Sequence, residues 1–566
     1  MRIPRHFVAA LCTTGGRANV SRLCALLIFS FAQAAFLNPP RVRAQAPYHL
    51  DLEGEYQPYR VPGIDERMLC GPCGHSASTT QQQVNRLRYE VHIGNPGDHL
   101  FDLTLRIPAA LGKLTLHLPA TTPGDMGFKQ HARYIDHFRA TGEQGRALMY
   151  ERVGAQSWNV EVPSPSEVVV TYRIHMNERD ILRLGSNGLG LNGGFLEGSS
   201  VFLYADDHMN DPVEVRYKLP EKWTVVTPLP SNQPGVFTAD GYRSLVDAPV
   251  QFGEMQERDV PVDDFRVRLV FDRPLPPYDS VAFDANVRAI MRQQIALFGA
   301  KPFSGYTIFI HWRPDLDYGG GIEHGRAMVL NVGSKWMLNL PVNAAGTIAH
   351  EIFHAWNGEA FHPTELDRWN FADANYSPHL WFVEGVTSYF ATLTLIRSRL
   401  RSEDQFFEMM SRSMTDYEND AGRGWTSLAE SGIAKWISSP DALDYYGGGE
   451  VTGFLLDLAL RLETDGQGGL DDVIRSLYDQ SRKLGYRGYD DSQLRASVSA
   501  IAGHDMSAFF DRYVTGRDSI DYASILSRAG LRFSRQRDPE GQVRVVIAPL
   551  EEQTPLQARI WSKILR

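Results

Sequence analysis

The sequence predicts a multidomain protein with an N-terminal all-β domain, an α+β domain and a mainly α-helical C-terminal region. Its 566 residues are too many for one hydrophobic core. Apolar residues alternate at period two through the first half of the chain and follow helical spacing in the second half. The Pro-Leu-Pro-Pro run at residues 274–277 separates the two patterns, so we expect a domain boundary near residue 275.

The composition excludes one class of partner. Apolar residues make up 43% of the chain and charged residues 22%, which is typical of a globular protein. The net charge of −10 comes from scattered acidic residues, and no run of Lys and Arg suggests a surface for phosphates. We therefore expect no nucleic-acid partner.

Residues 1–46 are predicted to be a signal peptide. Arginines up to Arg22 precede an apolar run over residues 23–37, which is shorter than the about 20 residues of a comfortable membrane span. Small-x-small patterns at residues 32–34 and 44–46 leave the cleavage site open. We expect export to the periplasm or the outside, with no stable membrane span after cleavage; a retained signal anchor is the alternative.

Cleavage would leave two of the four cysteines, Cys70 and Cys73. Their spacing matches a thioredoxin motif, but Gly and Pro surround them where a buried strand and a helix should stand. His75 lies one residue too late for haem attachment. A local disulfide in an oxidising compartment is the simpler prediction, although the role of the pair stays open.

Residues 47–275 are predicted to form the N-terminal β domain. Alternating apolar and polar residues, with β-branched and aromatic side chains, predict strands at residues 87–93, 101–107, 168–174 and 265–271. Six glycines between Gly185 and Gly198 are expected to form a loop.

The predicted pattern changes after residue 275, and helices dominate from Pro341 onward. Residues 276–400 would be the catalytic domain, with a helix at 282–298, a strand at 306–312 and a helix at 378–399. Residues 401–530 would be a helical domain that completes the active site. Its helices are expected at residues 403–417, 451–463, 470–484 and 507–514. Residues 531–566 would be a C-terminal tail, with one candidate strand at 543–547.

One short motif carries metal chemistry. His350 and His354 are four residues apart, so on a helix they lie on one face and can reach one ion at about 2.0–2.1 Å. Glu351 stands beside the first histidine, where a carboxylate can accept a proton from metal-activated water. An amphipathic helix with two surface histidines is the alternative, because short motifs recur by chance.

A candidate third ligand, Glu384, decides between these interpretations. Ser377 and Pro378 suit the start of a helix, and the segment that follows is apolar nearly all round. Glu384 is its one acid, and a buried carboxylate is costly unless it binds a cation. An exposed acid, or one paired with Arg397 or Arg399, is the alternative. Two His and one Glu leave a coordination position open for water, as catalytic zinc requires, so we expect one Zn²⁺ per chain.

These motifs resemble the glycyl aminopeptidase family of gluzincin zinc metallopeptidases, distant relatives of the aminopeptidase N family. The resemblance rests on three segments: 350–357 (HEIFHAWN), 381–389 (WFVEGVTSY) and 318–324 (YGGGIEH). A weaker echo, Thr122-Pro123-Gly124-Asp125, extends it to the N-terminal domain. It implies a thermolysin-like α+β catalytic domain.

The resemblance also implies roles for residues beyond the metal ligands. Glu323 would bind the free α-amine of the substrate, and Gly320 and Gly321 would let the peptide backbone approach closely. A tyrosine would donate a hydrogen bond to the oxyanion; Tyr446 is the first choice and Tyr445 the competing one. The family's C-terminal PDZ module is apparently missing, and Ala120 and Thr121 stand where an aromatic is usual; both departures weaken the inference about substrate.

We therefore expect an exported zinc metallo-aminopeptidase that removes N-terminal residues from peptides, with Glu351 as general base. A preference for glycine or alanine is implied by the resemblance only. A gluzincin endopeptidase and a degenerate peptide-binding protein are the alternatives. The natural substrate and the oligomeric state cannot be read from the sequence.

Overall fold

The computed structural model describes residues 86–175, 188–437 and 442–566, all of which belong to one compact unit that starts at Gln83. The expected signal peptide and the Cys70/Cys73 pair lie outside the described residues. Within the described ranges, no helix is both long enough and apolar enough to cross a membrane.

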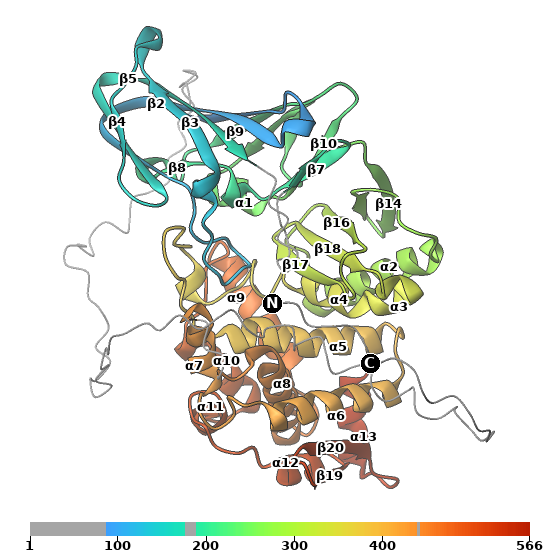
Figure 1. The fold of residues 1–566 in the computed structure, drawn as a ribbon. Coiled ribbons are helices and arrows are strands. Elements are labelled where there is room, and N and C mark those ends of the chain that lie inside the picture. The colour runs from blue at the N-terminus through green and yellow to red at the C-terminus, as the bar shows by residue number, and fades with distance from the viewer. Residues whose placement is uncertain (1–85, 176–187, 438–441) are drawn as a thin grey trace, which may run out of the picture. The chain divides into compact units, whose positions relative to one another are not determined.

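The N-terminal β domain is built on a nine-stranded sheet (Figure 1). Its main order is β11-β12-β9-β1-β2-β5-β3, with β4 paired to β5 and β8 paired to β2. Buried and exposed residues alternate along β1, as the period-two pattern predicted. The strands are β1 (Leu87–His92), β2 (Leu100–His117), β3 (Ile135–Thr141), β4 (Tyr150–Arg152), β5 (Ser157–His175), β8 (Tyr204–Ala205), β9 (Val213–Lys218), β11 (Ser231–Gln233) and β12 (Val236–Ala239).

A second sheet corrects one prediction. The glycine-rich stretch expected as a loop contains β6 (Gly188–Gly190) and β7 (Gly193–Leu196), which pair in the order β10-β13-β7-β6 with β10 (Thr224–Val226) and β13 (Val250–Gly253). A Cβ atom on Gly194 would lie 2.5 Å from the carbonyl oxygen of Gly188. The glycines therefore permit close strand approach here, which the loop prediction missed.

The third sheet carries one wall of the candidate site. Its order is β14-β15-β16-β18-β17, and the three central strands are parallel. They are β14 (Gln256–Val262), β15 (Phe265–Phe271), β16 (Tyr306–Arg313), β17 (Gly320–His324) and β18 (Ala327–Gly333). Helices α2 (Ser280–Phe298) and α4 (Ala345–Phe353) lie along this sheet (Figure 1). Two of its strands precede residue 275; the domain boundaries themselves stay predictions.

The helical region contains the helices predicted after residue 400, and three of them differ from the prediction by at most two residues at their ends. The helix predicted at 451–463 instead begins at Tyr445, so both candidate tyrosines lie in its first turn and not before it. The long helices of this region bury wide apolar faces in one core shared with the third sheet. The helices are α5 (Thr387–Arg397), α6 (Glu403–Asn419), α7 (Leu428–Ala434), α8 (Tyr445–Glu463), α9 (Leu470–Lys483), α10 (Asp491–Ala502), α11 (Ser507–Tyr513), α12 (Tyr522–Arg528) and α13 (Pro555–Ile564). Shorter helices α1 (Tyr242–Asp247) and α3 (Leu340–Asn343) lie earlier in the chain.

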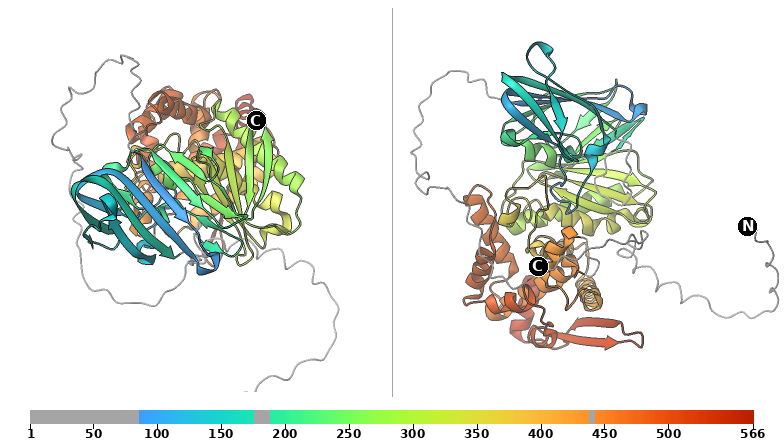
Figure 2. Two further views of the ribbon diagram at one scale, coloured as in Figure 1. Left: turned by 90° about the horizontal axis from the view of Figure 1, so that it is seen from above. Right: turned by 60° about the vertical axis from the view of Figure 1, so that its left-hand side comes forward.

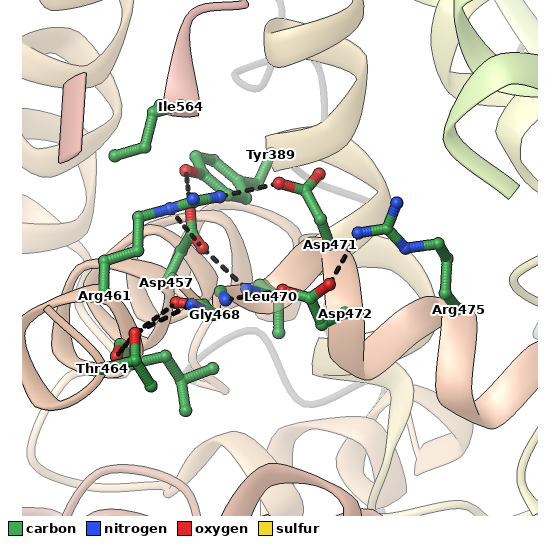
Figure 3. A network of polar contacts seen from close by, with 12 residues as sticks. Tyr389, Asp457, Arg461, Thr464, Gly468, Leu470, Asp471, Asp472, Arg475 and Ile564 are labelled. Carbon is green, nitrogen blue, oxygen red and sulfur yellow. Dashed lines mark hydrogen bonds and ion pairs between the residues drawn. The ribbon is translucent and has the colours of Figure 1, made fainter. Parts of the chain in front are cut away.

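A buried ion network joins these helices (Figure 3). Arg461 on α8 contacts Asp457 at 3.0 Å and Asp471 at 2.6 Å. Asp471 also binds Arg397 of α5 through two bonds, and the Tyr389 hydroxyl donates to Asp457 at 2.8 Å. Arg397 donates further to the carbonyl of Ile564, which ties the C-terminal helix to α5. We call these five residues, Tyr389, Arg397, Asp457, Arg461 and Asp471, the ion network.

The last residues form more than the expected tail. Strands β19 (Leu531–Arg537) and β20 (Val543–Pro549) make an antiparallel hairpin, visible at the end of the helical region in Figure 2. Three side chains of α6 bind the free edge of β20 in place of a third strand. The backbone N–H groups of residues 543, 545 and 547 donate to Asn419, Thr415 and Ser411 at 2.8–2.9 Å. The polar groups of this edge are thereby satisfied.

Candidate metal centre

Helix α4 positions the two histidines of the motif. Ile348 and Ile352 are fully buried and anchor the helix in the core shared with the third sheet. The helix ends at Phe353, and His354 is its C-cap residue. The four-residue spacing places the rings of His350 and His354 with centroids 4.7 Å apart. The predicted helix and the shared face are confirmed.

The candidate third ligand lies on a distorted helix. Residues Trp381–Val386 form a π-helix, which runs directly into α5. All six residues are buried, and Glu384 is 4% exposed. The burial confirms the apolar surroundings expected for this segment, whereas the π-helix was not predicted; such turns occur often at functional sites. Arg397, which the sequence offered as an alternative partner for Glu384, binds Asp471 instead.

The three candidate ligands converge on one point. His354 Nε2 lies 3.0 Å from His350 Nε2 and 3.1 Å from Glu384 Oε2, and His350 Nε2 lies 3.3 Å from the same oxygen. A triangle of this size accommodates one ion at about 2.0–2.1 Å from each donor. The residues therefore fit a zinc ion.

Neighbouring groups fix which ring nitrogens face the centre. His354 Nδ1 donates to the carbonyl of Asn357 at 2.9 Å. Ser388 Oγ donates to the Glu384 carbonyl at 3.0 Å and therefore accepts from His350 Nδ1 at 3.3 Å. With both Nδ1 atoms protonated, two Nε2 lone pairs and a carboxylate oxygen face one another. Only a cation or added protons can stabilise that arrangement.

Glu351 lies beside the triangle and against the edge strand β17. A Cβ atom on Gly321 would fall 2.6 Å from Glu351 Oε1, so residue 321 must lack a side chain for this carboxylate to stay in place. Oxygen atoms of Glu323 and Glu351 and a nitrogen of His354 all lie within 4.8 Å of one another. The structure thus brings Glu323, Gly321 and Glu351 together, while Gly320 lies on the same strand.

The site gathers three carboxyl groups, and burial and their mutual proximity shift the pKa values of the site. Burial and the charge of Glu323 raise the pKa of Glu351 well above its ordinary value. Burial raises the pKa of Glu323 to about 7, where His354 opposes the shift and Glu384 adds to it. Burial acts against protonation of His354, but Glu384 and the other carboxylates raise its pKa to about 10. Three carboxylates around two imidazoles therefore favour a bound cation.

The N-terminal domain contributes two residues next to strand β17: Gly124, which belongs to the 122–125 segment of the resemblance, and Asp247, which the sequence did not single out. Gly124 lies against Glu323: a Cβ atom there would be 3.1 Å from Oε1. Asp247 of α1 accepts from His324 Nδ1 at 3.2 Å and from the Gly325 N–H at 3.1 Å, so it holds the end of β17. Asp247 is 77 residues from His324 in sequence, and no local pattern signals such a pair.

The two candidate tyrosines differ in position. Tyr446 is 39% exposed, and its ring centroid lies 6.0 Å from that of His350. Tyr445 is 5% exposed and stacks on Tyr446 at 4.9 Å. Desolvation and the charge of Glu384 raise the pKa of Tyr446, so its phenol keeps the proton that a hydrogen-bond donor needs.

Comparisons with known proteins agree with this geometry. The model of the peptidase M61 N-terminal domain matches residues 88–254, and the model of the M61 glycyl aminopeptidase matches residues 343–452. None of the curated proteins compared matches the chain.

Solved structures share the fold. An aminopeptidase N family protein from Idiomarina loihiensis superposes with a TM-score of 0.74 and 25% identity, over 80% of this chain and 79% of that one. A mutant M1 zinc metallopeptidase from Deinococcus radiodurans gives a TM-score of 0.50 and 16% identity, over 77% and 95% of the two chains. Its complex with a Tyr-Ser-Ala substrate matches equally well. At this identity the second likeness shows the fold alone.

The two family models match parts of the chain that meet near the candidate ligands. The first covers the β domain, which contacts Glu323 through Gly124. The second covers the segment that holds His350, His354 and Glu384. The chain belongs to the M61 glycyl aminopeptidase family of metallopeptidases, distant relatives of the aminopeptidase N family, and is a peptidase.

Proposed function

We propose that this protein is a zinc metallo-aminopeptidase that removes N-terminal residues, small ones such as glycine or alanine first, from peptides. The observation that supports it best is the donor triangle of His350, His354 and Glu384, with Glu351 and Glu323 close to His354. One zinc ion bound by the triangle would polarise the scissile carbonyl and lower the pKa of water.

The residues around the triangle then divide the work. Glu351 accepts the proton of the attacking water and donates it to the leaving amine. Glu323 forms a charge-assisted hydrogen bond with the free α-ammonium group of the peptide. Gly320 and Gly321 on the edge strand leave room for the peptide backbone. Tyr446, the more exposed tyrosine, donates to the oxygen that becomes negative in the transition state.

The position of Glu323 favours an aminopeptidase over an endopeptidase. Its carboxylate is backed by Gly124 of the N-terminal domain, so a peptide extended past Glu323 would meet that loop. Hydrolysis of Gly- and Ala-p-nitroanilide should exceed that of the Leu and Arg analogues, and an N-acetylated peptide should be refused. Cleavage of the acetylated peptide would support the endopeptidase, and zinc binding without any hydrolysis would support a peptide-binding protein.

Glu351→Gln tests the assigned base. Gln keeps the size of the side chain but cannot accept the proton, so we expect kcat to fall about 10²–10⁴-fold. Zinc content should stay at one ion per chain. The measurement is steady-state hydrolysis by the full chain, before and after chelator treatment and zinc restoration.

Glu418→Gln is the matched control. Glu418 is also a buried glutamate, but its partners are Arg423 and Arg535, outside the site. This variant should lose stability and keep kcat for the folded enzyme. If both variants lowered kcat equally, the assignment of Glu351 as base would be wrong.

Export to the periplasm or the outside is part of the same proposal, and it is supported by the sequence of residues 1–46 alone. Mass measurement of the N-terminus of protein isolated from the exporting cell tests it. Loss of about the first 46 residues is the expected result, and an intact Met1 would contradict it.

A further inference from the structure

We infer that Asn357 is a positioning residue for the metal centre, because it holds His354 with its backbone and the helix of Glu384 with its side chain. The inference rests on the proposed function in one respect: the ion at the triangle is taken to be zinc. Asn357 is fully buried and lies three residues after His354, the C-cap residue of α4.

The side chain of Asn357 binds the π-helix at two points and the first residue of α5 at a third. Its Nδ2 group donates to the carbonyls of Phe382 and Val383 at 2.9 and 3.2 Å, and to Thr387 Oγ1 at 3.1 Å. Thr387 in turn donates its hydroxyl proton to the Val383 carbonyl at 2.6 Å, so it can only accept from Asn357. All three partners are acceptors, which leaves one orientation for the amide.

These bonds bear on the shape of the helix that carries Glu384. A π-helix departs from the i to i−4 bonding of an α-helix, so some of its carbonyls need partners from elsewhere. Asn357 supplies them for the two residues immediately before Glu384. Because the segment is buried, water cannot take over that role. Asn357 therefore helps to hold the widened turn from which the Glu384 carboxylate reaches the histidines.

The backbone of Asn357 acts on the other ligand. Its carbonyl accepts from His354 Nδ1 at 2.9 Å, which directs Nε2 of that ring to the centre. One residue thus sets the tautomer of one candidate ligand and the position of another, 27 residues further along the chain. The far end of its side chain, Oδ1, has no hydrogen-bond partner among the described residues. An unsatisfied buried oxygen is costly, so the donor end accounts for the asparagine.

The decisive variant is Asn357→Asp, which keeps the shape and replaces the donor with a second acceptor. A carboxylate oxygen would then face two carbonyls and a committed hydroxyl. We expect zinc affinity, measured by competition with a chromogenic chelator, to fall about 10–100-fold. The visible spectrum of the Co²⁺-substituted protein should also change, because the ligand geometry changes.

Asn375→Asp is the matched control. Asn375 is buried too, and its amide also donates to two backbone carbonyls, those of Asn370 and Asp373 at 3.0 and 3.2 Å. It contacts neither the triangle nor the π-helix through these bonds. This variant should lose comparable stability while its zinc affinity and Co²⁺ spectrum stay as in the wild type.

The outcomes separate the two proposals. A wild-type protein that binds no zinc at the triangle would overturn the proposed function. Zinc affinity and spectrum unchanged in Asn357→Asp, with a zinc-binding wild type, would overturn the positioning role alone. If Asn357→Asp fails to fold, Thr387→Val removes one contact of the amide at constant volume. A zinc affinity equal to wild type in that variant would also overturn the inference; a decrease of several-fold is expected.

Discussion

The molecule contains two buried clusters of charge that are compensated in opposite ways. The candidate metal centre gathers three carboxylates and two imidazoles, and the lone pairs of its three candidate ligands face one another at 3.0–3.3 Å. In the ion network, part of which is labelled in Figure 3, the two arginines balance the two aspartates, and every contact joins a donor to an acceptor. The two clusters are adjacent in sequence: Ser388 contacts the candidate ligand His350, and Tyr389 belongs to the ion network.

The difference lies in where the compensating charge comes from. Burial disfavours ionised Asp471, yet Arg397 and Arg461 still lower its pKa, so the ion network is complete as the chain folds. The metal centre cannot be completed by the chain, because no Lys or Arg of the described residues forms an ion pair with Glu323, Glu351 or Glu384. A cluster that supplies its own counter-charge is structural, and one that lacks it is open to a ligand.

The largest effect is expected from Arg461→Met, which breaks the ion network. Asp457 would lose its arginine partner, and Asp471 would lose one of its two, while both carboxylates stay buried. Such a loss costs about 3–5 kcal/mol in unfolding free energy. Urea unfolding measures it. The double variant Asp457→Leu/Arg461→Met should recover part of the loss, because it removes the orphaned charge. A cost below about 1 kcal/mol for the single variant would place the ion network among ordinary surface pairs.

A smaller effect is expected when the metal is withdrawn from the metal centre. With free zinc at about 100 times its Kd, binding adds about 2.7 kcal/mol to the stability of the folded state. Thermal unfolding with and without chelator measures the difference, and zinc should restore the higher transition. Glu384→Gln should show little dependence on zinc. A wild-type transition that ignores both chelator and zinc would show that the centre needs no cation.

The smallest effect on stability is expected from a third buried group of charges, which consists of one histidine between two acids. His379 is buried between Glu365 at 3.6 Å and Asp491 at 3.5 Å. Burial opposes its ionisation, but Asp491 and Glu365 raise its pKa to about 9. A raised pKa stabilises the fold fully below the unfolded value of about 6.5, and this contribution is lost as pH rises through 9.

We therefore expect the unfolding free energy to fall by about 1 kcal/mol more in the wild type than in His379→Gln between pH 7 and pH 9.5. Chemical unfolding at several pH values measures it. Parallel curves for the two proteins would mean that this histidine is not charged in the folded state.

The parts of the fold that follow from local spacing were predictable. Alternation identified β1, β5 and β15, and the four-residue interval of His350 and His354 placed both rings on one helix face. Glu384 was predicted as a ligand because a lone acid in an apolar segment is costly without a cation, and the structure buries it beside the two histidines.

The parts that depend on distant partners were not predictable. The π-helix is held by hydrogen bonds from Asn357, which lies 25 residues before the first carbonyl that its amide binds. The periodicity of the sequence does not indicate these bonds. Gly193 and Gly194 of β7 permit close packing against Phe252, which lies far along the chain. The acceptors for Arg397 and His324 are likewise 74 and 77 residues away.

The row of hydrogen bonds between the side chains of α6 and the edge of β20 can reach only a limited length. Side chains four residues apart on a helix advance about 6.0 Å, whereas alternate residues of a strand advance about 6.8 Å. The two spacings differ by about 0.8 Å at each successive hydrogen bond, so the mismatch accumulates along the pair. A fourth side chain in line with Ser411, Thr415 and Asn419 would be misaligned by more than a hydrogen bond tolerates. A helix can therefore replace a strand only over a short length, and α6 does so here along residues 543–547 of β20.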